Sequence, residues 1–318
     1  MNNLLEIKNI NLYFELESSQ AQALYDVSLS LNKGETLALV GESGCGKTLT
    51  AMSIINLLPK NAVLKSGEIL FDGKNLLNLS QNELQKIRGS KIAFIPQDPL
   101  TSLNPLFTVG EQIKETIKIH KNISETEAKS LAIEALKAVS IPEAEQRYDE
   151  YPHQFSGGMR QRAIIAMALS CSPEMIIADE PTTALDVTIQ AQILELIKEV
   201  QTKFNTAMLL ITHDLGVVAE TCQRVVVMYA GRIVEIANVK ELFANPLHPY
   251  TVGLLNSIPS VKGEKLQVIK GQPPSVTEEI SGCPFHPRCP KAFDICKNIK
   301  PQLKETAENH FVSCHLYN

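Results

Sequence analysis

The chain has 318 residues, enough for about two domains that each bury a core. Hydrophobic residues make up 44% and charged residues 20%, and the net charge is −5, which argues against a broad basic face for nucleic acid. No apolar run approaches the roughly 18 residues that span a bilayer. The segment MNNLLEIKNINLYFE lacks a basic stretch before an apolar block, so we expect no secretory signal. In the reducing compartment that this implies, the seven cysteines are thiols or ligands, not disulfides.

The order of the predicted elements indicates an α/β fold. Residues 4–40 contain three β-rich runs, LLEIKNINLYF, ALYDVSLSLN and TLALVG. A glycine-rich loop and a helix follow from position 41. Residues 100–172 show helical periodicity, with Ser124 as a candidate cap and a Glu at the third helical position. Between 175 and 237, the strand-like runs EMIIAD, AMLLITH, RVVVMYA and RIVEIA alternate with helices, which is typical of a sheet with helical crossovers.

The segment GESGCGKT matches the phosphate-loop pattern G-x-x-x-x-G-K-[ST], between a predicted strand and a predicted helix. Its glycines let backbone N–H groups turn toward a phosphate, and the helix N-terminus adds partial positive charge. Lys47 is expected to reach the β- and γ-phosphates, and the Thr48 hydroxyl to hold Mg²⁺. Cys45 is interpreted as a small filler, with a redox switch as the alternative. The predicted nucleotide-binding residues here are Gly41, Glu42, Ser43, Gly44, Cys45, Gly46, Lys47 and Thr48.

The apolar segment EMIIADE predicts a buried strand that ends in two carboxylates. Adjacent carboxylates at a strand end are costly unless they share a cation or a proton. Asp179 is therefore predicted to hold the Mg²⁺ shell, and Glu180 to be the general base that polarises the attacking water.

A second glycine-rich turn, FSGGMRQR, precedes another predicted helix. One nucleotide needs a single such cradle, so the second makes sense if it closes on nucleotide held by another subunit. With these motifs the chain resembles the ATP-binding cassette (ABC) family over residues 1 to about 260. The resemblance rests on motifs in family order: GESGCGKT, Gln97 in FIPQDP, SGGMRQ in place of the commoner SGGQ, Asp179 and Glu180, ALD at 184–186, and His213 in ITHD.

The resemblance implies a P-loop ATPase cassette with a RecA-like core, an antiparallel β subdomain and a helical subdomain at about 100–172. It implies a head-to-tail dimer in which the partner's Ser156, Gly157 and Gly158 close on each ATP. Gln97 would contact Mg²⁺ and the water, and His213 would hold the γ-phosphate. Phe14 is chosen over Tyr13 as the adenine platform. The implied catalytic set is Lys47, Gln97, Glu180 and His213, and Asp186 joins the nucleotide-binding set.

Longer strings, among them PQDPLTSLNPLFTVGEQI, HPYTVGLLNSIP and GCPFHPRCP, resemble the ATPase subunits of oligopeptide/dipeptide importers. This implies an ATPase domain at 1–245 and a C-terminal extension at 246–318. It also implies a distinct partner ATPase, two membrane permeases, an external substrate-binding protein and a place on the cytoplasmic face of the inner membrane. The alternatives are a nickel or antimicrobial-peptide importer and a non-transport ATPase of the superfamily.

Four cysteines near the C-terminus have the spacing C-x5-C-x6-C-x17-C, which is wider than the C-x2-C pairs common in zinc sites. In the importer resemblance this pattern implies a [4Fe-4S] cluster, while another metal and unmetallated thiols stay open as alternatives. A small tail without a core of its own is expected to gain its fold from the metal. The predicted ligands are Cys283, Cys289, Cys296 and Cys314.

Overall fold

The computed structural model describes residues 3–17, 19–182, 187–257 and 269–317, and the chain divides into two compact units. The first unit comprises Met1–Leu77 and Ile211–Asn318, and the second comprises Asn78–Leu210. Within the described ranges, no helix combines the length and the apolar character needed to cross a bilayer. The domain boundaries expected from the sequence stay a prediction.

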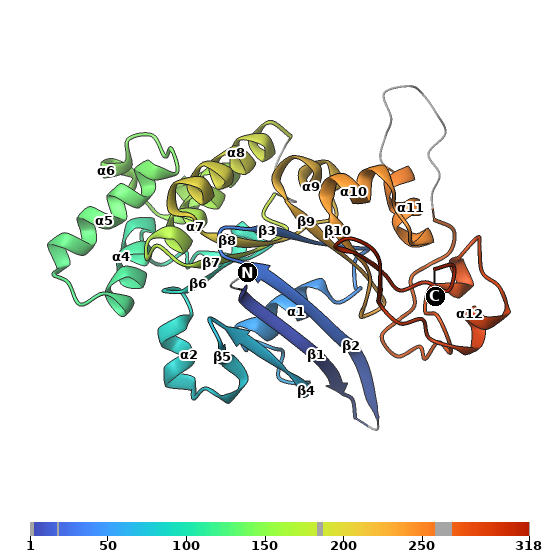
Figure 1. The fold of residues 1–318 in the computed structure, drawn as a ribbon. Helices are drawn as coiled ribbons and strands as arrows, with labels where there is room; N and C mark the ends of the chain where they lie inside the picture. The colour runs from blue at the N-terminus through green and yellow to red at the C-terminus, as the bar shows by residue number, and fades with distance from the viewer. Residues whose placement is uncertain (1–2, 18, 183–186, 258–268, 318) are drawn as a thin grey trace. The chain divides into compact units, whose positions relative to one another are not determined.

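The first unit carries two groups of strands and a set of short helices (Figure 1). Its strands are β1 (Asn3–Glu15), β2 (Gln20–Asn32), β3 (Thr36–Val40), β4 (Ala62–Phe71), β5 (Lys74–Asn75), β9 (Arg224–Tyr229), β10 (Arg232–Asn238), β11 (Lys304–Ala307) and β12 (His310–Val312). Its helices are α1 (Lys47–Ile54), α9 (Leu215–Thr221), α10 (Val239–Ala244), α11 (Pro249–Asn256), η3 (His286–Arg288) and α12 (Asp294–Asn298), and the short turn η1 (Leu76–Asn78) ends its first segment.

Two sheets organise this unit. One is antiparallel with the strand order β2-β1-β4-β5, and the other places β11-β12-β10-β9-β3 side by side. β3 runs parallel to β9, so the strand before the phosphate loop is fully buried beside a second apolar strand. β9 and β10 form an antiparallel hairpin that turns at residues 230–231. The expectation of a helix between the runs RVVVMYA and RIVEIA is therefore wrong, because the left-handed backbone of Ala230 and Gly231 allows a tight turn.

The C-terminal residues are built into the core of the first unit. Phe285 is 1% exposed, and its ring lies 5.1 Å from that of Tyr229 and 5.4 Å from that of Tyr250. β12 pairs with β10, so the last strand extends the sheet that contains β3. The buried side chains of Cys283 and Cys296 belong to the same apolar cluster. The C-terminal region thus has an apolar core to fold against, whereas the sequence predicted a tail that lacks one.

The second unit is mainly helical. It contains α2 (Gln81–Ile87), α3 (Pro99–Ser102), α4 (Val109–His120), α5 (Glu125–Ala138), α6 (Ala144–Arg147), η2 (Pro152–Gln154), α7 (Gly157–Leu169) and α8 (Val187–Phe204), with the strands β6 (Ile92–Ile95), β7 (Met175–Asp179) and β8 (Ala207–Ile211). The strands lie in the order β8-β7-β6, and α4, α5 and α7 pack on one another (Figure 1). The predicted cap is confirmed: Ser124 Oγ accepts a hydrogen bond from the N–H of Glu127 at 3.2 Å.

Candidate active site

The phosphate loop joins β3 to α1 in the first unit. Gly41 begins the loop with φ +152°, and a Cβ at this position would lie 2.3 Å from the carbonyl oxygen of Met228. Only glycine fits so close to a neighbouring backbone. Gly46 caps α1 in the left-handed region at φ 106°. The helix N-terminus therefore points into the loop, where its free N–H groups favour an anion.

The lysine of the loop is placed for phosphate binding. Lys47 is 6% exposed, and its Nζ donates to the carbonyl oxygens of Gly41 at 2.8 Å and Glu42 at 3.1 Å. The ammonium group is thus held across the loop, while Thr48 at the next position is exposed. A nucleoside triphosphate with Mg²⁺ requires hydrogen-bond donors and a metal ligand. The loop offers an ammonium group, a helix N-terminus and a threonine hydroxyl for these roles. The chemistry of the loop therefore fits the predicted cofactors.

Cys45 is a buried part of the same loop, at 4% exposed. Burial raises the pKa of its thiol, and the nearby charge of Lys47 only partly offsets this effect. A thiol with a raised pKa is a poor nucleophile at neutral pH. The interpretation of Cys45 as a small filler residue agrees with this environment.

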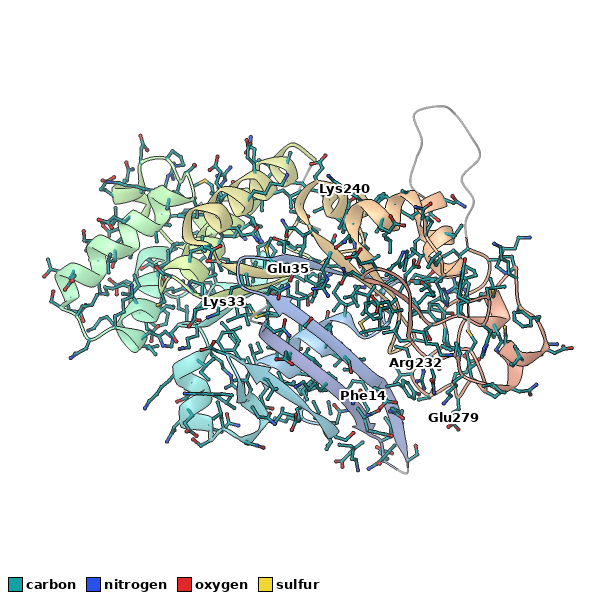
Figure 2. All side chains as sticks on the ribbon, viewed as in Figure 1. Phe14, Lys33, Glu35, Arg232, Lys240 and Glu279 are labelled. Carbon is teal, nitrogen blue, oxygen red and sulfur yellow. The ribbon has the colours of Figure 1, made fainter. Side chains whose placement is uncertain are left out.

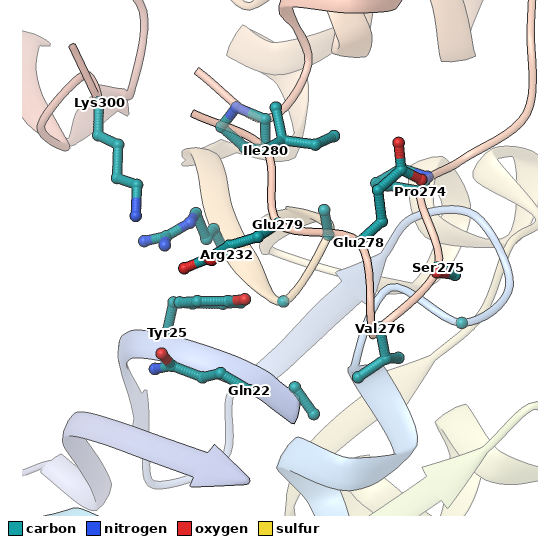
Figure 3. Close-up of a pocket in the computed structure, with 15 residues that line it drawn as sticks. Gln22, Tyr25, Arg232, Pro274, Ser275, Val276, Glu278, Glu279, Ile280 and Lys300 are labelled. Carbon is teal, nitrogen blue, oxygen red and sulfur yellow. The ribbon is translucent and has the colours of Figure 1, made fainter. Parts of the chain in front are cut away.

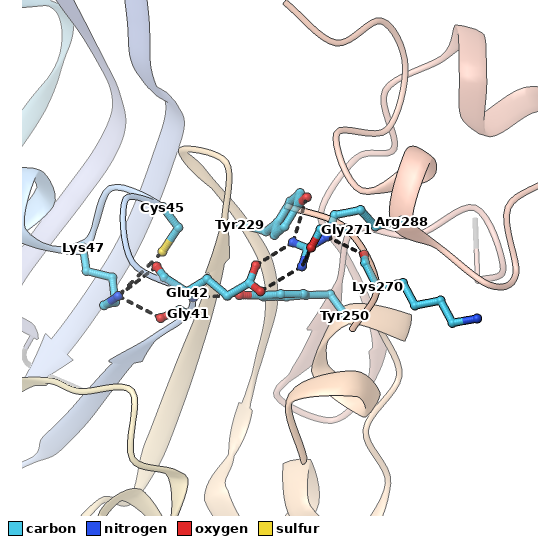
Figure 4. Close-up of polar contacts among 9 residues, drawn as sticks. All are labelled: Gly41, Glu42, Cys45, Lys47, Tyr229, Tyr250, Lys270, Gly271 and Arg288. Atoms are coloured by element: carbon cyan, nitrogen blue, oxygen red, sulfur yellow. Dashed lines mark hydrogen bonds and ion pairs between the residues drawn. The ribbon is translucent and has the colours of Figure 1, made fainter. Parts of the chain in front are cut away.

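Two residues bound to this loop were not predicted. The N–H of Glu42 donates to the hydroxyl of Tyr250 at 2.8 Å, and the carboxylate of Glu42 pairs with Arg288 (Figure 4). Tyr250 and Arg288 lie more than 200 positions from the loop in sequence. No local motif signals such a contact, so only the fold reveals it.

Phe14 and Tyr13 occupy opposite faces of β1. The ladder of β1 with β4 is regular from Leu12 to Phe14, so Leu12 and Phe14 share one face and Tyr13 points to the other. Leu24, directly opposite Leu12, reaches within 2.6 Å of where a Cβ of Gly46 would lie. Tyr13 instead donates its hydroxyl to Gln22 at 2.8 Å. Phe14, near the end of β1 (Figure 2), therefore lies on the same strand face as Leu12, opposite to Tyr13.

In the second unit, β7 ends at the predicted pair of carboxylates. Asp179 is 3% exposed, and Glu180 follows it with φ +46°. The left-handed region is uncommon for a residue with a long side chain, and such strain is found at functional sites. Gln97, which follows β6, donates its amide to Glu180 Oε2 at 2.9 Å. Because β6 and β7 are adjacent and parallel, their carboxyl ends bring these two predicted catalytic residues together.

The second glycine-rich turn forms the beginning of α7. Ser156 is the N-cap, and its Oγ accepts from the N–H of Met159 at 3.3 Å. Gly157 is exposed, and a Cβ on it would meet nothing within 4 Å. Gly158 is half-buried against Ile189 of α8. The turn therefore presents a helix N-terminus with little side-chain cover, as the prediction of a second phosphate cradle requires.

His213 follows β8 and is exposed in the first unit. Next to it, Asp214 caps α9 by accepting from the N–H groups of Gly216 and Val217 at 2.8 and 3.3 Å. The cap fixes the backbone of the turn and leaves His213 at its surface. The remaining predicted nucleotide-binding residue, Asp186, lies outside the described residues.

The four C-terminal cysteines converge on one small cavity of about 10 Å³. Burial raises the pKa of Cys283 to about 11 and also raises the pKa values of Cys289 and Cys314. Among the described residues, no group of three or more metal-ligating side chains has an arrangement that could hold a metal ion. The described residues therefore give the predicted cluster no support as a metal site, although they bring its four predicted ligands together.

The fold and its motifs define an ATP-binding cassette. The model of the family described as "ABC transporter" matches residues 24–183, and the chain belongs to this family. It is accordingly an ATPase of the ABC type. A second model, described as "Oligopeptide/dipeptide transporter, C-terminal region", matches residues 234–296.

Similar proteins extend over nearly the full chain. A probable peptide ABC transporter ATP-binding protein of Sinorhizobium fredii is 53% identical over 98% of this chain and 94% of its own length. The oligopeptide transport ATP-binding protein AppD of Bacillus subtilis is 51% identical over 100% of this chain and 98% of its own length. OppD of Escherichia coli, with the same description, is 48% identical over 98% and 92%.

Solved structures are similar to the cassette. A dimeric ATP-binding cassette in a post-hydrolysis state, bound to ADP and Pi, aligns with TM-score 0.67 and 29% identity. It covers 74% of this chain and 98% of the solved chain. A cassette of Clostridium perfringens that is part of an ABC transporter complex aligns with TM-score 0.66, 29% identity and coverage of 77% and 92%. These similarities confirm the predicted cassette fold.

Proposed function

We propose that the chain is the ATP-hydrolysing subunit of an importer for dipeptides and oligopeptides. The observation that carries the proposal is the joint occurrence of a complete cassette motif set and the matched C-terminal region at residues 234–296. The relatives described above as oligopeptide transport ATP-binding proteins support it, because each aligns with at least 98% of this chain.

In this proposal each motif has a separate chemical role. Lys47 binds the β- and γ-phosphates, and Thr48 and Asp179 hold Mg²⁺. Glu180 orients and deprotonates the attacking water, with Gln97 beside its carboxylate at 2.9 Å. His213 contacts the γ-phosphate. Mg²⁺ supplies charge neutralisation when it is bound with ATP.

The second glycine-rich turn is proposed to act on nucleotide held by another cassette. We infer that Ser156, Gly157 and Gly158 serve ATP held by a partner ATPase, since Ser156 and Gly157 are exposed at this helix N-terminus. The dimeric cassette solved with ADP and Pi supports a paired arrangement. The proposed partner is a distinct ATPase subunit, and Asp186 is proposed to contribute to the same dimeric nucleotide sites.

The adenine platform in this proposal is Phe14. Its place near the end of β1, on the face opposite to that of Tyr13, supports the choice, whereas Tyr13 is engaged with Gln22. Stacking of a base on an aromatic ring contributes roughly 1–3 kcal/mol. The Phe14→Leu variant should therefore bind ATP at least several-fold more weakly, while Tyr13→Leu should not. Nucleotide titrations of the two variants decide between these residues, and a larger loss in Tyr13→Leu would reverse the assignment.

The second unit offers a surface for a membrane permease. A groove of about 810 Å³ runs along α4 and includes Phe107, Glu111 and Ile119. Phe107 and Ile119 are 54% and 69% exposed, so apolar side chains are in contact with solvent at this groove. We propose that a cytoplasmic helix of a permease docks here, which places the chain on the cytoplasmic face of the inner membrane. Two permeases and an external substrate-binding protein complete the proposed importer.

The transport proposal is tested in proteoliposomes that contain the chain, its partner ATPase and the cognate permeases. Peptide-loaded binding protein should stimulate ATP hydrolysis and drive uptake of labelled peptide. The Glu180→Gln variant, assembled in the same way, is the control and should support neither. Stimulation by nickel with no response to peptides would replace the proposed substrate.

The iron–sulfur cluster is a finer proposal for the C-terminal region. It is supported by the convergence of the four cysteines on one cavity. Iron and acid-labile sulfide are measured on protein purified without oxygen. About four of each per chain would establish the cluster, whereas their absence would leave four thiols in a protein core.

A further inference from the structure

The second residue of the phosphate loop, Glu42, is bound by an arginine of the C-terminal region. Arg288 NH1 lies 2.6 Å from Glu42 Oε2, and NH2 lies 2.9 Å from Oε1 (Figure 4). The two parallel contacts form the two-pronged geometry that makes arginine–carboxylate pairs strong and directional. Both residues belong to the first unit.

The side chain of Arg288 is also held by partners other than Glu42. Its side chain is 6% exposed, and it ends the short helical turn η3. Nε donates to the carbonyl of Lys270 at 3.1 Å, and NH2 donates to that of Gly271 at 3.2 Å. NH1 also donates to the hydroxyl of Tyr229 at 3.4 Å. A guanidinium held by this many partners has little freedom left, so the position of Glu42 follows that of Arg288.

The backbone of Glu42 is engaged as well. Its N–H donates to the hydroxyl of Tyr250, and its carbonyl accepts from Lys47. The same residue therefore connects the predicted phosphate-binding lysine to the C-terminal region. The C-terminal region also comes close to the phosphate loop at Gly44. This glycine lines a cavity of about 50 Å³ together with Glu278 and Ile280 (Figure 3).

The charge of Glu42 explains why an arginine is needed. A nucleoside triphosphate brings several negative charges to a loop that already contains this carboxylate. Like charges in a partly buried site repel and weaken binding. Arg288 neutralises Glu42 and holds its side chain in one direction. Without the guanidinium, the negative charge of the carboxylate is no longer compensated, and its side chain is free to turn toward the phosphates.

We propose that Arg288 is a positioning residue for nucleotide binding, through which the C-terminal region holds the phosphate loop in the conformation that accepts ATP. Arg288 acts through Glu42 and does not itself contact the nucleotide. The C-terminal region thereby contributes to the affinity of the cassette for ATP. This proposal rests on ATP binding by the phosphate loop.

The test is the affinity of the purified full-length chain for a fluorescent ATP analogue with Mg²⁺. Arg288→Gln should raise Kd about tenfold, a change of about 1.4 kcal/mol. Glu42→Gln removes the charge that requires neutralising, so Arg288→Gln should raise Kd much less in the Glu42→Gln background than in the wild-type chain. A purely additive effect of the two substitutions would overturn the proposal.

Arg224 provides the matched control. It pairs with Glu35 at 2.9 Å in the same unit. Its side chain donates to Glu35 and to the carbonyl of Ser30, and neither belongs to the phosphate loop. Arg224→Gln removes a partly buried ion pair of the same residue types, although with a single contact, and should leave Kd unchanged. Equal losses of affinity in Arg224→Gln and Arg288→Gln would show a general loss of stability and reject the positioning role.

Alkylation of Cys45 gives a local readout that does not require activity. This thiol is 4% exposed in the loop, and Cys171 in the second unit serves as an internal reference. Mass spectrometry of Arg288→Gln should show faster labelling of Cys45 with unchanged labelling of Cys171. Unchanged rates at both would contradict the proposal. If Arg288→Gln does not fold, Arg288→Lys, which keeps the charge without the two-pronged geometry, carries the same measurements with a smaller expected change.

A wild-type chain that binds ATP, beside an Arg288→Gln variant with the same Kd, would refute the positioning role alone. Failure of the wild-type chain to bind ATP would instead refute the assignment of the phosphate loop. The two failures are thus distinguishable in one titration series.

Discussion

Glu180→Gln is expected to abolish ATP turnover while leaving ATP bound. Glutamine keeps the size and a hydrogen-bonding oxygen but cannot take a proton from water. Removal of a general base lowers a rate by roughly 10²- to 10⁴-fold. The phosphate loop and Lys47 are untouched, so affinity for ATP should remain. Phosphate release and nucleotide affinity, measured on the same preparation, check both halves of this expectation.

The control for this variant is Glu174→Gln. Glu174 lies just before β7 and forms an exposed ion pair with Lys91 at 3.0 Å. Exposed pairs of this kind contribute little to stability. Turnover by Glu174→Gln should therefore equal that of the wild type. Hydrolysis by Glu180→Gln at a rate near that of Glu174→Gln would remove Glu180 from its role as the base.

A second consequence concerns the dimer. In the proposed head-to-tail pair, ATP closes the two cassettes and hydrolysis reopens them. A variant that binds ATP without turnover should accumulate in the closed pair. Size-exclusion chromatography with ATP and Mg²⁺ should then show a larger species for Glu180→Gln, mixed with its partner ATPase, than for the wild-type mixture.

The local motifs could be predicted from the sequence because each is short and its geometry is set by neighbours in the chain. Gly41 must be glycine where the loop touches the backbone of Met228, and Asp179 ends a strand whose residues are all buried. Each motif places its own residues, and the pattern of residue types carries that information. The cap at Ser124 is predictable for the same reason.

The contacts of the C-terminal region could not be predicted in this way. Arg288 reaches Glu42 across 246 positions, and no periodicity or spacing specifies which carboxylate it meets. Tertiary packing decides such contacts. The hairpin of β9 and β10 is a different case, because only Ala230 and Gly231 separate the two apolar runs. A crossover needs a dozen or more residues, so the short linker with its glycine was a turn signal that the sequence already contained.

The four cysteines show that spacing alone does not tell whether thiols pack in a core or bind a metal. Their spacing suggested a tail held by metal, yet Cys283 and Cys296 are buried in an apolar cluster with Phe285 and Tyr229. Cysteine is among the most buried residue types and packs as a small apolar side chain. In the described structure, the fold of this region follows from burial and strand pairing.

Among the substitutions considered, removal of the buried carboxylate of Glu235 is expected to lower the free energy of unfolding the most. Glu235 is 0% exposed, and its oxygens accept from the N–H groups of Leu247 at 2.8 Å and His248 at 2.9 Å. Its Oε1 also lies 2.7 Å from Nε2 of His310, which is 1% exposed on β12. One carboxylate thus joins β10, the segment before α11 and the final strand.

Glu235→Ala leaves three polar groups without this partner, two of them buried. Breaking a buried pair by removal of one member costs about 3–5 kcal/mol, so the free energy of unfolding should fall by about that amount. Urea denaturation measures it. Glu241→Gln is the matched control, because Glu241 is 43% exposed and only 4.0 Å from Nδ1 of the same histidine; its effect should stay within about 0.5 kcal/mol. If Glu235→Ala unfolds no more readily than Glu241→Gln, the C-terminal strand is held by something other than this pair. A large loss confined to Glu235→Ala would instead establish that the C-terminal region is anchored to the cassette through its own buried polar contacts.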